Sequence, residues 1–344
     1  MKMYYLGAQP HWLGPDSPLP ERVPVCVSRG RLEGRKTLPR ASRRWMLDSK
    51  SYTVLSRNQD DGGYARWDIS PHQYVRLVRE YADQIGCLDT ASSMDWMCEG
   101  PVRANTGFDI SEHLRRTVIS YWELRWLDAD LQIFPVIQGD ASLTVDHHLR
   151  CVDMYERAGV DLAALPLVGV GSVCRLPSTA RIIALFAALQ RRLGTDVRLH
   201  AFGVKTDALT AIAPGIYSAD SHAWSKHGRD TVRRCPHSHS GVTWEANCPI
   251  GALEWYDRTL QEASGTTPAT WARKVETYQR RGDNGLLFED LYPAAIQPTV
   301  GDRIASSVRA FLPEGTEPAL ATMLDNFVTH PSINQGASPC PTTP

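Results

Sequence analysis

The sequence predicts a (β/α)8 barrel, in which eight parallel strands alternate with helices around a closed sheet. Eight short runs with the composition of strands occur within the first 220 residues or so. Helical patterns separate the later runs, and this alternation favours a parallel sheet. No GxGxxG motif follows the first run, which disfavours the main alternative, a doubly wound open sheet.

The individual elements follow from the local pattern of apolar residues. The runs typical of strands are 3–8, 23–28, 44–49, 87–95, 133–139, 162–171, 197–204 and 215–220. Spacings typical of helices occur at 70–86, 109–127, 144–159 and 178–194, with further helical stretches around 251–263 and 268–281. Asp109 or Ser111 is suited to cap the second helix, and Gly159 and Gly194 to end the third and fourth.

The composition is that of a folded globular protein. Hydrophobic residues make up 42% and charged residues 22% of the 344 positions, which excludes a disordered or fibrous chain. The formal net charge of −1 means that contact with nucleic acid would require a local basic patch. No apolar run is long enough for a membrane span or a secretory signal, and the eight cysteines are scattered as in proteins with reduced thiols. We therefore expect a cytoplasmic protein without a membrane partner.

The chain divides by composition into three parts. Residues 1–225 contain all the expected strands and would form the barrel domain. Residues 226–255 are rich in His, Cys, Arg and Trp, so 226–330 are expected to form a metal-binding loop and C-terminal helices packed on the barrel. Residues 331–344 have the composition of a disordered tail.

Polar residues stand at the ends of several expected strands. Catalytic groups of such barrels lie at the carboxyl ends of the strands, which here supply Asp48, Asp95, Gln138, Gly169 and Asp220. One aspartate in such a position is as readily explained by helix capping. Three of them, with an amide, indicate a site in which carboxylates act as nucleophile, as general acid or base, or as hydrogen-bond acceptors.

A cluster of cysteines and histidines follows the last expected strand. Cys235, His237, His239 and Cys248 offer four ligands within fourteen residues, which suits tetrahedral zinc. Because protein ligands would fill the coordination sphere, we expect a structural ion. Glu245 and His227 are alternatives for the fourth ligand.

A basic segment precedes the strand of Asp48. Residues 29–44 carry seven basic side chains against Glu33 alone, a pattern that fits phosphate binding and also an ordinary solvated loop. The candidate nucleic-acid contacts are Arg35, Lys36, Arg40, Arg43 and Arg44.

The order of five motifs resembles the tRNA-guanine transglycosylase superfamily, and most closely its deazapurine DNA-modification branch from bacteria and phages. The resemblance covers about residues 4–260 and rests on the ordered set, since no single motif is specific. LDSKSY resembles the DSGGFQ strand end of that superfamily, MDWMCE its FDE segment, and VIQGD its VQGG. LPLVGVG resembles GGLAVG, and YSADSHAW resembles the segment that carries the nucleophile.

The resemblance implies an exchange of guanine in DNA for a 7-deazaguanine, such as 7-cyano-7-deazaguanine, through a covalent aspartyl–sugar intermediate. Asp220 would be the nucleophile, and Asp48 would pass a proton to and from the base. The implied base-binding residues are Asp95, Gln138, Gly139, Leu167, Val168 and Gly169. The implied setting is a bacterial or phage-infected cell, with structural zinc as the cofactor and a homodimer or helper proteins as further partners.

Two other functions remain open at this stage. One is the same exchange on tRNA, as in queuine-type enzymes, and the other is a non-catalytic zinc-containing DNA-binding protein. A barrel glycoside hydrolase is a weaker third.

The chain departs from the family pattern at a few positions around these motifs. Lys50 and Ser51 replace the glycine pair of DSGGFQ, which we expect to narrow or recharge the pocket floor, and Asp140 replaces the second glycine of VQGG. Asp89 shares a strand face with Asp95 and is the alternative for its role, although Asp95 is nearer the mouth.

Overall fold

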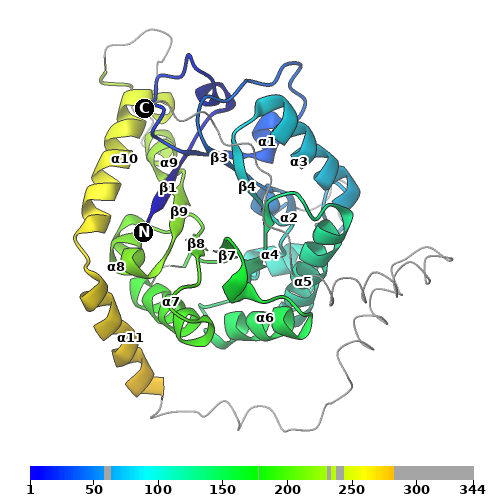
Figure 1. The fold of residues 1–344 in the computed structure, drawn as a ribbon, viewed down its shortest axis with the longest axis vertical. Coiled ribbons are helices and arrows are strands. Elements are labelled where there is room, and N and C mark those ends of the chain that lie inside the picture. The colour runs from blue at the N-terminus through cyan, green and yellow to red at the C-terminus, as the bar shows by residue number, and fades with distance from the viewer. Residues whose placement is uncertain (58–62, 177, 231–233, 238–243, 283–344) are drawn as a thin grey trace, which may run out of the picture.

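The computed structural model describes residues 1–57, 63–176, 178–230, 234–237 and 244–282 (Figure 1). Its centre is a nine-stranded parallel sheet in the order β5-β4-β3-β2-β1-β9-β8-β7-β6. The two outermost strands, β5 (Ile133–Phe134) and β6 (Val136–Ile137), are separated by Pro135 alone. They are thus one strand position interrupted by a residue that lacks an N–H group. The sheet curls into a nearly closed barrel with eight strand positions, which confirms the predicted architecture.

Each of the remaining strands overlaps one of the expected runs. They are β1 (Met3–Gly7), β2 (Val25–Ser28), β3 (Trp45–Asp48), β4 (Leu88–Ser92), β7 (Val168–Val170), β8 (Leu199–Ala201) and β9 (Ser218–Ser221). β1 pairs with both β2 and β9, so the first and last strands are neighbours. This pairing joins the two ends of the barrel sequence, so the break in the sheet lies between β5 and β6.

The helices surround the sheet (Figure 1). The longer ones are α3 (Pro71–Ile85), α5 (Ile110–Leu127), α6 (Asp146–Arg157), α7 (Thr179–Leu193), α10 (Pro249–Ser264) and α11 (Pro268–Gly282). The shorter ones are α1 (Arg29–Leu32), α2 (Ser51–Leu55), α4 (Gly100–Thr106), α8 (Thr206–Ile212) and α9 (Ala223–Asp230). Short 3-10 turns are η1 (Pro10–Leu13), η2 (Leu162–Ala164), η3 (Ala213–Gly215) and η4 (Glu245–Asn247).

The helix ends follow capping rules. The Asp109 side chain accepts a hydrogen bond from the backbone N–H of Glu112, so Asp109 rather than Ser111 caps α5. Ser70 and Gln73 form a capping box at the start of α3. Gly159 has φ +78° just after α6, the left-handed conformation that glycine adopts at low cost.

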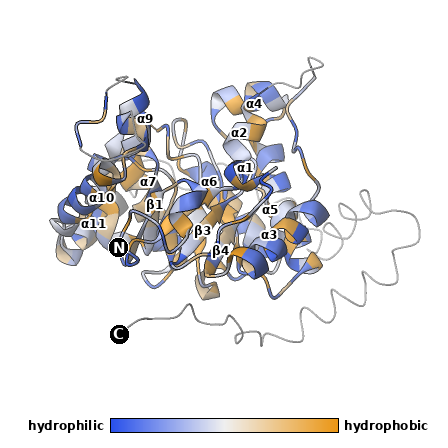
Figure 2. Ribbon diagram, turned by 90° about the horizontal axis from the view of Figure 1, so that it is seen from above, coloured by the Kyte–Doolittle hydropathy of each residue, from blue (hydrophilic) through white to orange (hydrophobic). Residues whose placement is uncertain are grey.

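The two largest apolar clusters lie on opposite faces of the sheet, and a third contains Leu55, Trp96 and Val102. One fills the barrel interior and comprises Tyr5, Cys26, Met46, Phe134, Val136 and Leu167. The other lies between the strands and the surrounding helices, and Figure 2 shows hydrophobic residues concentrated around β3 and β4. Because side chains alternate along a strand, Asp48 faces the interior as Met46 does, at the mouth end.

The C-terminal helices pack on the outside of the barrel. The indole Nε1 of Trp271, in α11, donates to Oε1 of Gln190 in α7 at 2.5 Å. Gly215 leaves room for that indole, since a Cβ there would lie 2.3 Å from Trp271 Nε1. The predicted disordered tail, 331–344, lies outside the described residues. No helix in the described ranges is long and apolar enough to cross a membrane.

Candidate active site

Asp48 and Asp220 meet at the carboxyl end of the barrel. Asp48 is the last residue of β3, and Asp220 lies in β9 opposite Tyr5 of β1. Burial raises the pKa of Asp48 above its ordinary value, and the Asp220 charge adds to the rise. Burial and both carboxylates also raise the pKa of the Cys26 thiol in the interior. Two carboxyl groups from separate strands thus share one enclosure, and Asp48 is able to hold a proton.

A backbone N–H and a histidine ring contact the Asp220 carboxylate. Its Oδ1 accepts from the backbone N–H of Gly203 at 3.0 Å and lies 3.3 Å from Nε2 of His200. His200 is fully buried, and its Nδ1 lies 2.9 Å from the Ser218 hydroxyl. If Ser218 donates to Nδ1, the remaining ring hydrogen is on Nε2 and points at Asp220. Asp220 is therefore held by groups from β8 and from the turn that follows it.

Ser221 and His222, the polar residues that follow Asp220 in the sequence, make other contacts. The Ser221 hydroxyl accepts from the backbone N–H of Ala223 at 3.0 Å. The His222 ring packs against Gly7, where a Cβ would lie 2.3 Å away. His200 was missed because it lies on the neighbouring strand, twenty residues before Asp220, and only the strand pairing brings them together.

Asp95 follows β4 and is the third carboxyl group at the mouth. It is buried, and its Oδ2 accepts a hydrogen bond from Nε2 of Gln138. Burial raises the pKa of Asp95 to about 7, opposed by hydrogen bonds from Gln138 and Ser51 and reinforced by the Asp48 charge. Ser51, which replaces a family glycine, therefore contributes a donor to Asp95.

Asp89 lies at the other end of the barrel. Its carboxylate accepts from the Tyr5 hydroxyl at 3.1 Å and from Nε of Arg44 at 2.7 Å. This ion pair sits near the amino-terminal ends of β3 and β4, away from Asp48 and Asp220. Of the two aspartates on this strand segment, only Asp95 is at the mouth.

Glycines near the mouth leave room for neighbouring residues that a Cβ atom would clash with. A Cβ on Gly171 would lie 2.2 Å from Gln138 Nε2, and one on Gly139 would lie 2.6 Å from the backbone N of His148. Gly169 faces the interior beside Phe134 and Phe202. The side chains of Leu167 and Val168 belong to the inner and outer cores. The backbone N–H groups of Val168 and Gly169 donate to the carbonyls of Arg198 and Pro135 within the sheet. Leu167 precedes β7, at the amino-terminal end of that strand, so the structure does not bring it to the mouth with Gln138.

Lys50 does not recharge the pocket floor as expected. Its Nζ lies 2.7 Å from Glu33 and 3.0 Å from Asp68. Its backbone has φ +73°, the region favoured by glycine, and its N–H donates to Asp48 Oδ2 at 3.2 Å. The lysine thus keeps the glycine-like backbone and directs its charge into an ion-pair cluster that includes buried Arg29.

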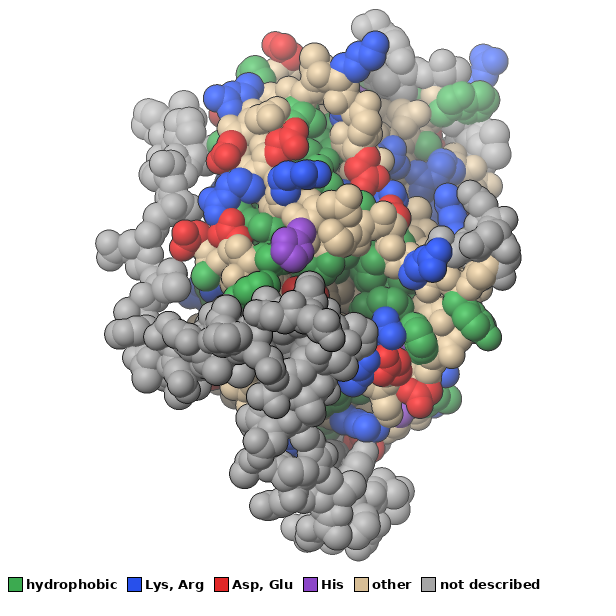
Figure 3. Space-filling view, turned by 90° about the vertical axis from the view of Figure 1, so that its right-hand side faces the viewer, with side chains coloured by type: hydrophobic (Ala, Val, Ile, Leu, Met, Phe, Trp, Pro, Cys, Tyr) green, Lys and Arg blue, Asp and Glu red, His purple; other side chains and the backbone are tan. Residues whose placement is uncertain are grey.

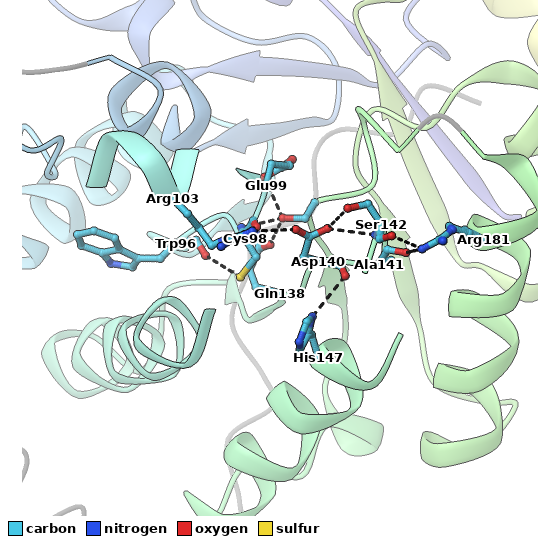
Figure 4. Close-up of polar contacts among 11 residues, drawn as sticks. Trp96, Cys98, Glu99, Arg103, Gln138, Asp140, Ala141, Ser142, His147 and Arg181 are labelled. Atoms are coloured by element: carbon cyan, nitrogen blue, oxygen red, sulfur yellow. Dashed lines mark hydrogen bonds and ion pairs between the residues drawn. The ribbon is translucent and has the colours of Figure 1, made fainter. Parts of the chain in front are cut away.

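Asp140, the other departure, is neutralised by Arg103. The guanidinium of Arg103 lies 3.2 Å from Asp140 Oδ2 and donates through Nε to the carbonyl of Cys98 at 2.9 Å (Figure 4). The same carboxylate accepts from the backbone N–H of Ser142 at 3.1 Å. Arg103 comes from α4, a short helix that periodicity did not predict.

Three of the four expected metal ligands lie together. The ligand atoms of Cys235, His237 and Cys248 are all within 4.8 Å of one another and could hold a metal ion. Nδ1 of His237 faces Cys248 Sγ at 3.2 Å, while its Nε2 lies 3.3 Å from Glu254. A carboxylate behind a histidine is the usual second partner of a metal-bound imidazole.

Other features of this cluster also suit a metal. Cys248 is the residue before α10, and its Sγ accepts a hydrogen bond from the backbone N–H of Gly251 at 3.3 Å, which holds the sulfur in place. His239 lies outside the described residues. Glu245 is not part of the cluster that the described residues form.

The basic segment is split between the two ends of the barrel. Arg35 and Lys36 are exposed and follow α1 on the mouth side, where the Arg35 charge adds to burial in lowering the pKa of His11. Arg40, Arg43 and Arg44 precede β3 and lie at the amino-terminal end.

These three arginines also have partners within the protein. Arg40 donates to the carbonyls of Asp83 and Gln84. The buried guanidinium of Arg43 donates to the carbonyls of Leu19 and Pro20, at 3.0 and 2.8 Å, so it is not accessible to a phosphate. On the face with α3 and α5, Figure 3 shows acidic and basic side chains interspersed rather than gathered by sign.

The fold and the mouth together define a (β/α) barrel protein equipped for acid–base and nucleophilic chemistry at carboxyl groups. The family model of DeoxyPurine in DNA protein A (DpdA) matches residues 1–284, and the chain belongs to that family. The resemblance to the deazapurine DNA-modification branch is thereby confirmed, and membership indicates a transglycosylase-type enzyme of DNA modification. A comparison with curated proteins finds no match.

Proposed function

We propose that this chain exchanges guanine in DNA for a 7-deazaguanine base through a covalent intermediate on Asp220. The observation that carries the proposal is the contrast between the mouth carboxyl groups. The Asp220 carboxylate accepts from the backbone N–H of Gly203 and faces the ring of His200, whereas the pKa values of Asp48 and Asp95 are raised by burial. A carboxylate held in position for attack, beside a carboxyl group in Asp48 that is able to hold a proton, is what a nucleophile and an acid require.

The reaction proceeds in two displacements at one carbon. A carboxylate oxygen of Asp220 attacks the anomeric carbon, and the bond from that carbon to guanine breaks with its electrons remaining on the base. Asp48 gives the departing guanine a proton. The incoming 7-deazaguanine then loses its ring N–H proton to Asp48, attacks the same carbon and releases Asp220.

Base recognition falls to groups that line the mouth. Asp95 accepts from donor groups on the base edge, Gln138 orients Asp95, and the backbone at Gly139 approaches the base closely. The target nucleotide must leave the DNA stack to enter the mouth, at a cost of about a few kcal/mol. Exposed Arg35 and Lys36 are placed to contact the phosphates beside it.

Nucleoside mass spectrometry tests the reaction directly. DNA and tRNA from cells that express this chain and receive a deazapurine supply should be digested and compared. A deazaguanine nucleoside in DNA supports the proposal, and the same nucleoside only in tRNA would replace it with the tRNA reaction. Expression of Asp220→Asn is the control, because it preserves shape and removes the nucleophilic charge.

We further propose that zinc is the metal held by Cys235, His237 and Cys248, with His239 as the fourth ligand. Zinc would close the loop between Cys235 and Cys248 within the appendage that follows the barrel domain of residues 1–225, a structural role. Metal analysis should give about one zinc per chain. Cys248→Ser should lose the metal and melt at lower temperature. Cys174→Ser, a substitution outside this cluster, should do neither. Metal-free protein of unchanged stability contradicts the assignment.

A further inference from the structure

Four polar side chains form a hydrogen-bonded series that begins at the mouth, namely Asp95, Gln138, Ser172 and Glu99. The Ser172 hydroxyl oxygen lies 2.9 Å from Oε2 of Glu99 and 2.7 Å from Oε1 of Gln138. Gln138 in turn contacts Asp95 through its amide nitrogen. Figure 4 shows Glu99 and Gln138 close together beside Asp140. Three hydrogen-bond links therefore connect two carboxyl groups.

The neutral members of this chain supply only two of the three hydrogens required. Ser172 has a single hydroxyl hydrogen, and the Gln138 amide donates on one side while it accepts on the other. The backbone N–H of Cys98 also points at the Ser172 oxygen, at 2.9 Å, and occupies one of its lone pairs. The third hydrogen must come from a carboxyl group, so either Glu99 or Asp95 is protonated.

Two arrangements satisfy every link. In the first, protonated Glu99 donates to Ser172, Ser172 donates to the Gln138 oxygen, and the Gln138 nitrogen donates to ionised Asp95. In the second, all the links reverse after a half-turn of the Gln138 amide: Asp95 is protonated and Glu99 is ionised. Gly171 permits either orientation, because it places no Cβ against the amide.

The environment of Asp95 and Glu99 favours the state in which this pair carries one proton over the state in which it carries none. Burial raises the pKa of both Asp95, to about 7, and Glu99. Asp48 and Ser51 face Asp95 with opposing effects. Arg175 and Asp140 face Glu99, also with opposing effects, and Arg103 pairs with Asp140. Two negative charges joined by this chain would leave one link without its hydrogen.

We propose that Glu99 and Asp95 share a single proton through Ser172 and Gln138. The position of this proton decides whether Asp95 offers a base a hydrogen-bond acceptor or a donor. With the proton on Glu99, Asp95 is an acceptor, which matches the N–H donors that guanine and 7-deazaguanine have in common. With the proton on Asp95, the site offers a donor. Glu99 is a positioning residue, since it acts on the base through Ser172 and Gln138, and this consequence rests on the proposed function.

Infrared difference spectroscopy tests the shared proton without any need for activity. Asp48→Asn removes the other mouth carboxyl that is able to hold a proton, and in that background the protein should show a protonated-carboxyl band at neutral pH. Adding Glu99→Gln should remove this band, because an amide supplies the missing hydrogen permanently. Adding Glu112→Gln, a glutamate ion-paired with Arg115 and Arg116, should leave it. A band unchanged by Glu99→Gln overturns the proposal.

Exchange kinetics test the consequence for base binding. In the enzyme with Asp48 intact, KM for the deazaguanine should rise at alkaline pH as the shared proton is lost, and Glu99→Gln should make KM independent of pH there. The fall of kcat caused by ionisation of Asp48 should persist in both proteins. Equal KM profiles contradict the positioning role. Absence of exchange in the wild type would instead count against the proposed function and leave the infrared result standing.

Discussion

Aspartates at the two ends of the barrel differ in their ion-pair and hydrogen-bond partners. At the amino-terminal end, Asp89 is ion-paired with Arg44 and bonded to Tyr5. At the mouth, the described residues give Asp48, Asp95 and Asp220 no ion pair with lysine or arginine, and their partners are amides, hydroxyls and an imidazole. Burial raises the pKa of Asp89 as it raises those of Asp48 and Asp95, but Arg44 and Tyr5 oppose the rise at Asp89. A carboxylate engaged by an ion pair stabilises the fold, whereas a buried one without an ion pair remains available to move protons or attack.

The largest difference between the ends should come from matched aspartate substitutions. Asp220→Asn should abolish both the covalent enzyme–DNA adduct on denaturing gels and base exchange, a loss of about a thousandfold or more. Asp89→Asn should keep exchange close to wild type and lower only the thermal stability, because it leaves Arg44 unpaired. Exchange by Asp220→Asn would move the nucleophile to Asp48 or Asp95.

Removing the imidazole that holds Asp220 should have the next largest effect. His200→Ala deletes one of two donors to that carboxylate, and a hydrogen bond to a charged group contributes about 1.5–3 kcal/mol. We expect the rate of adduct formation to fall about tenfold to a hundredfold. His222→Ala, at a nearby histidine without this bond, is the control. A larger loss for His222→Ala would show that the histidine adjacent to Asp220 in the sequence, and not His200, supports the nucleophile.

The raised pKa of Asp95 makes stability depend on pH. In the folded protein the pKa of Asp95, which shares a proton with Glu99 in the proposal above, is about 7, whereas in the unfolded chain Asp95 releases its proton near pH 4. Stability from this group is therefore present at low pH and falls as pH rises through this window, by at most about 1.4 kcal/mol per unit. Asp95→Asn should flatten that slope in urea titrations at successive pH values. An unchanged slope would show that Asp95 is not protonated in the folded state.

The smallest effect should distinguish the two halves of the basic segment. Neutralising Arg35 and Lys36 to Gln should weaken DNA binding and reduce its salt dependence by about one unit of slope per lost phosphate contact. The pair Arg40→Gln and Arg44→Gln, at the opposite end of the barrel, should leave the slope unaltered. If both pairs behave alike, DNA does not approach through the mouth side of α1.

The sequence by itself determined the strand positions, the main helices and the polar residues at strand ends, because burial imposes periodicities that a single chain records. It also separated Asp95 from Asp89, since distance along a strand fixes which end a residue occupies. Cys235, His237 and Cys248 were equally local, as all lie within one short stretch.

Only the tertiary structure decided which side chains serve these residues. His200 reaches Asp220 across a strand pair, Ser172 joins Glu99 to Gln138 from another loop, and Arg103 neutralises Asp140 from α4. The basic segment looked continuous, yet the turn into β3 carries part of it to the far end of the barrel. Parallel strands bring together residues far apart in the chain, so hydrogen-bond partners and shared protons are set by strand pairing rather than by sequence spacing.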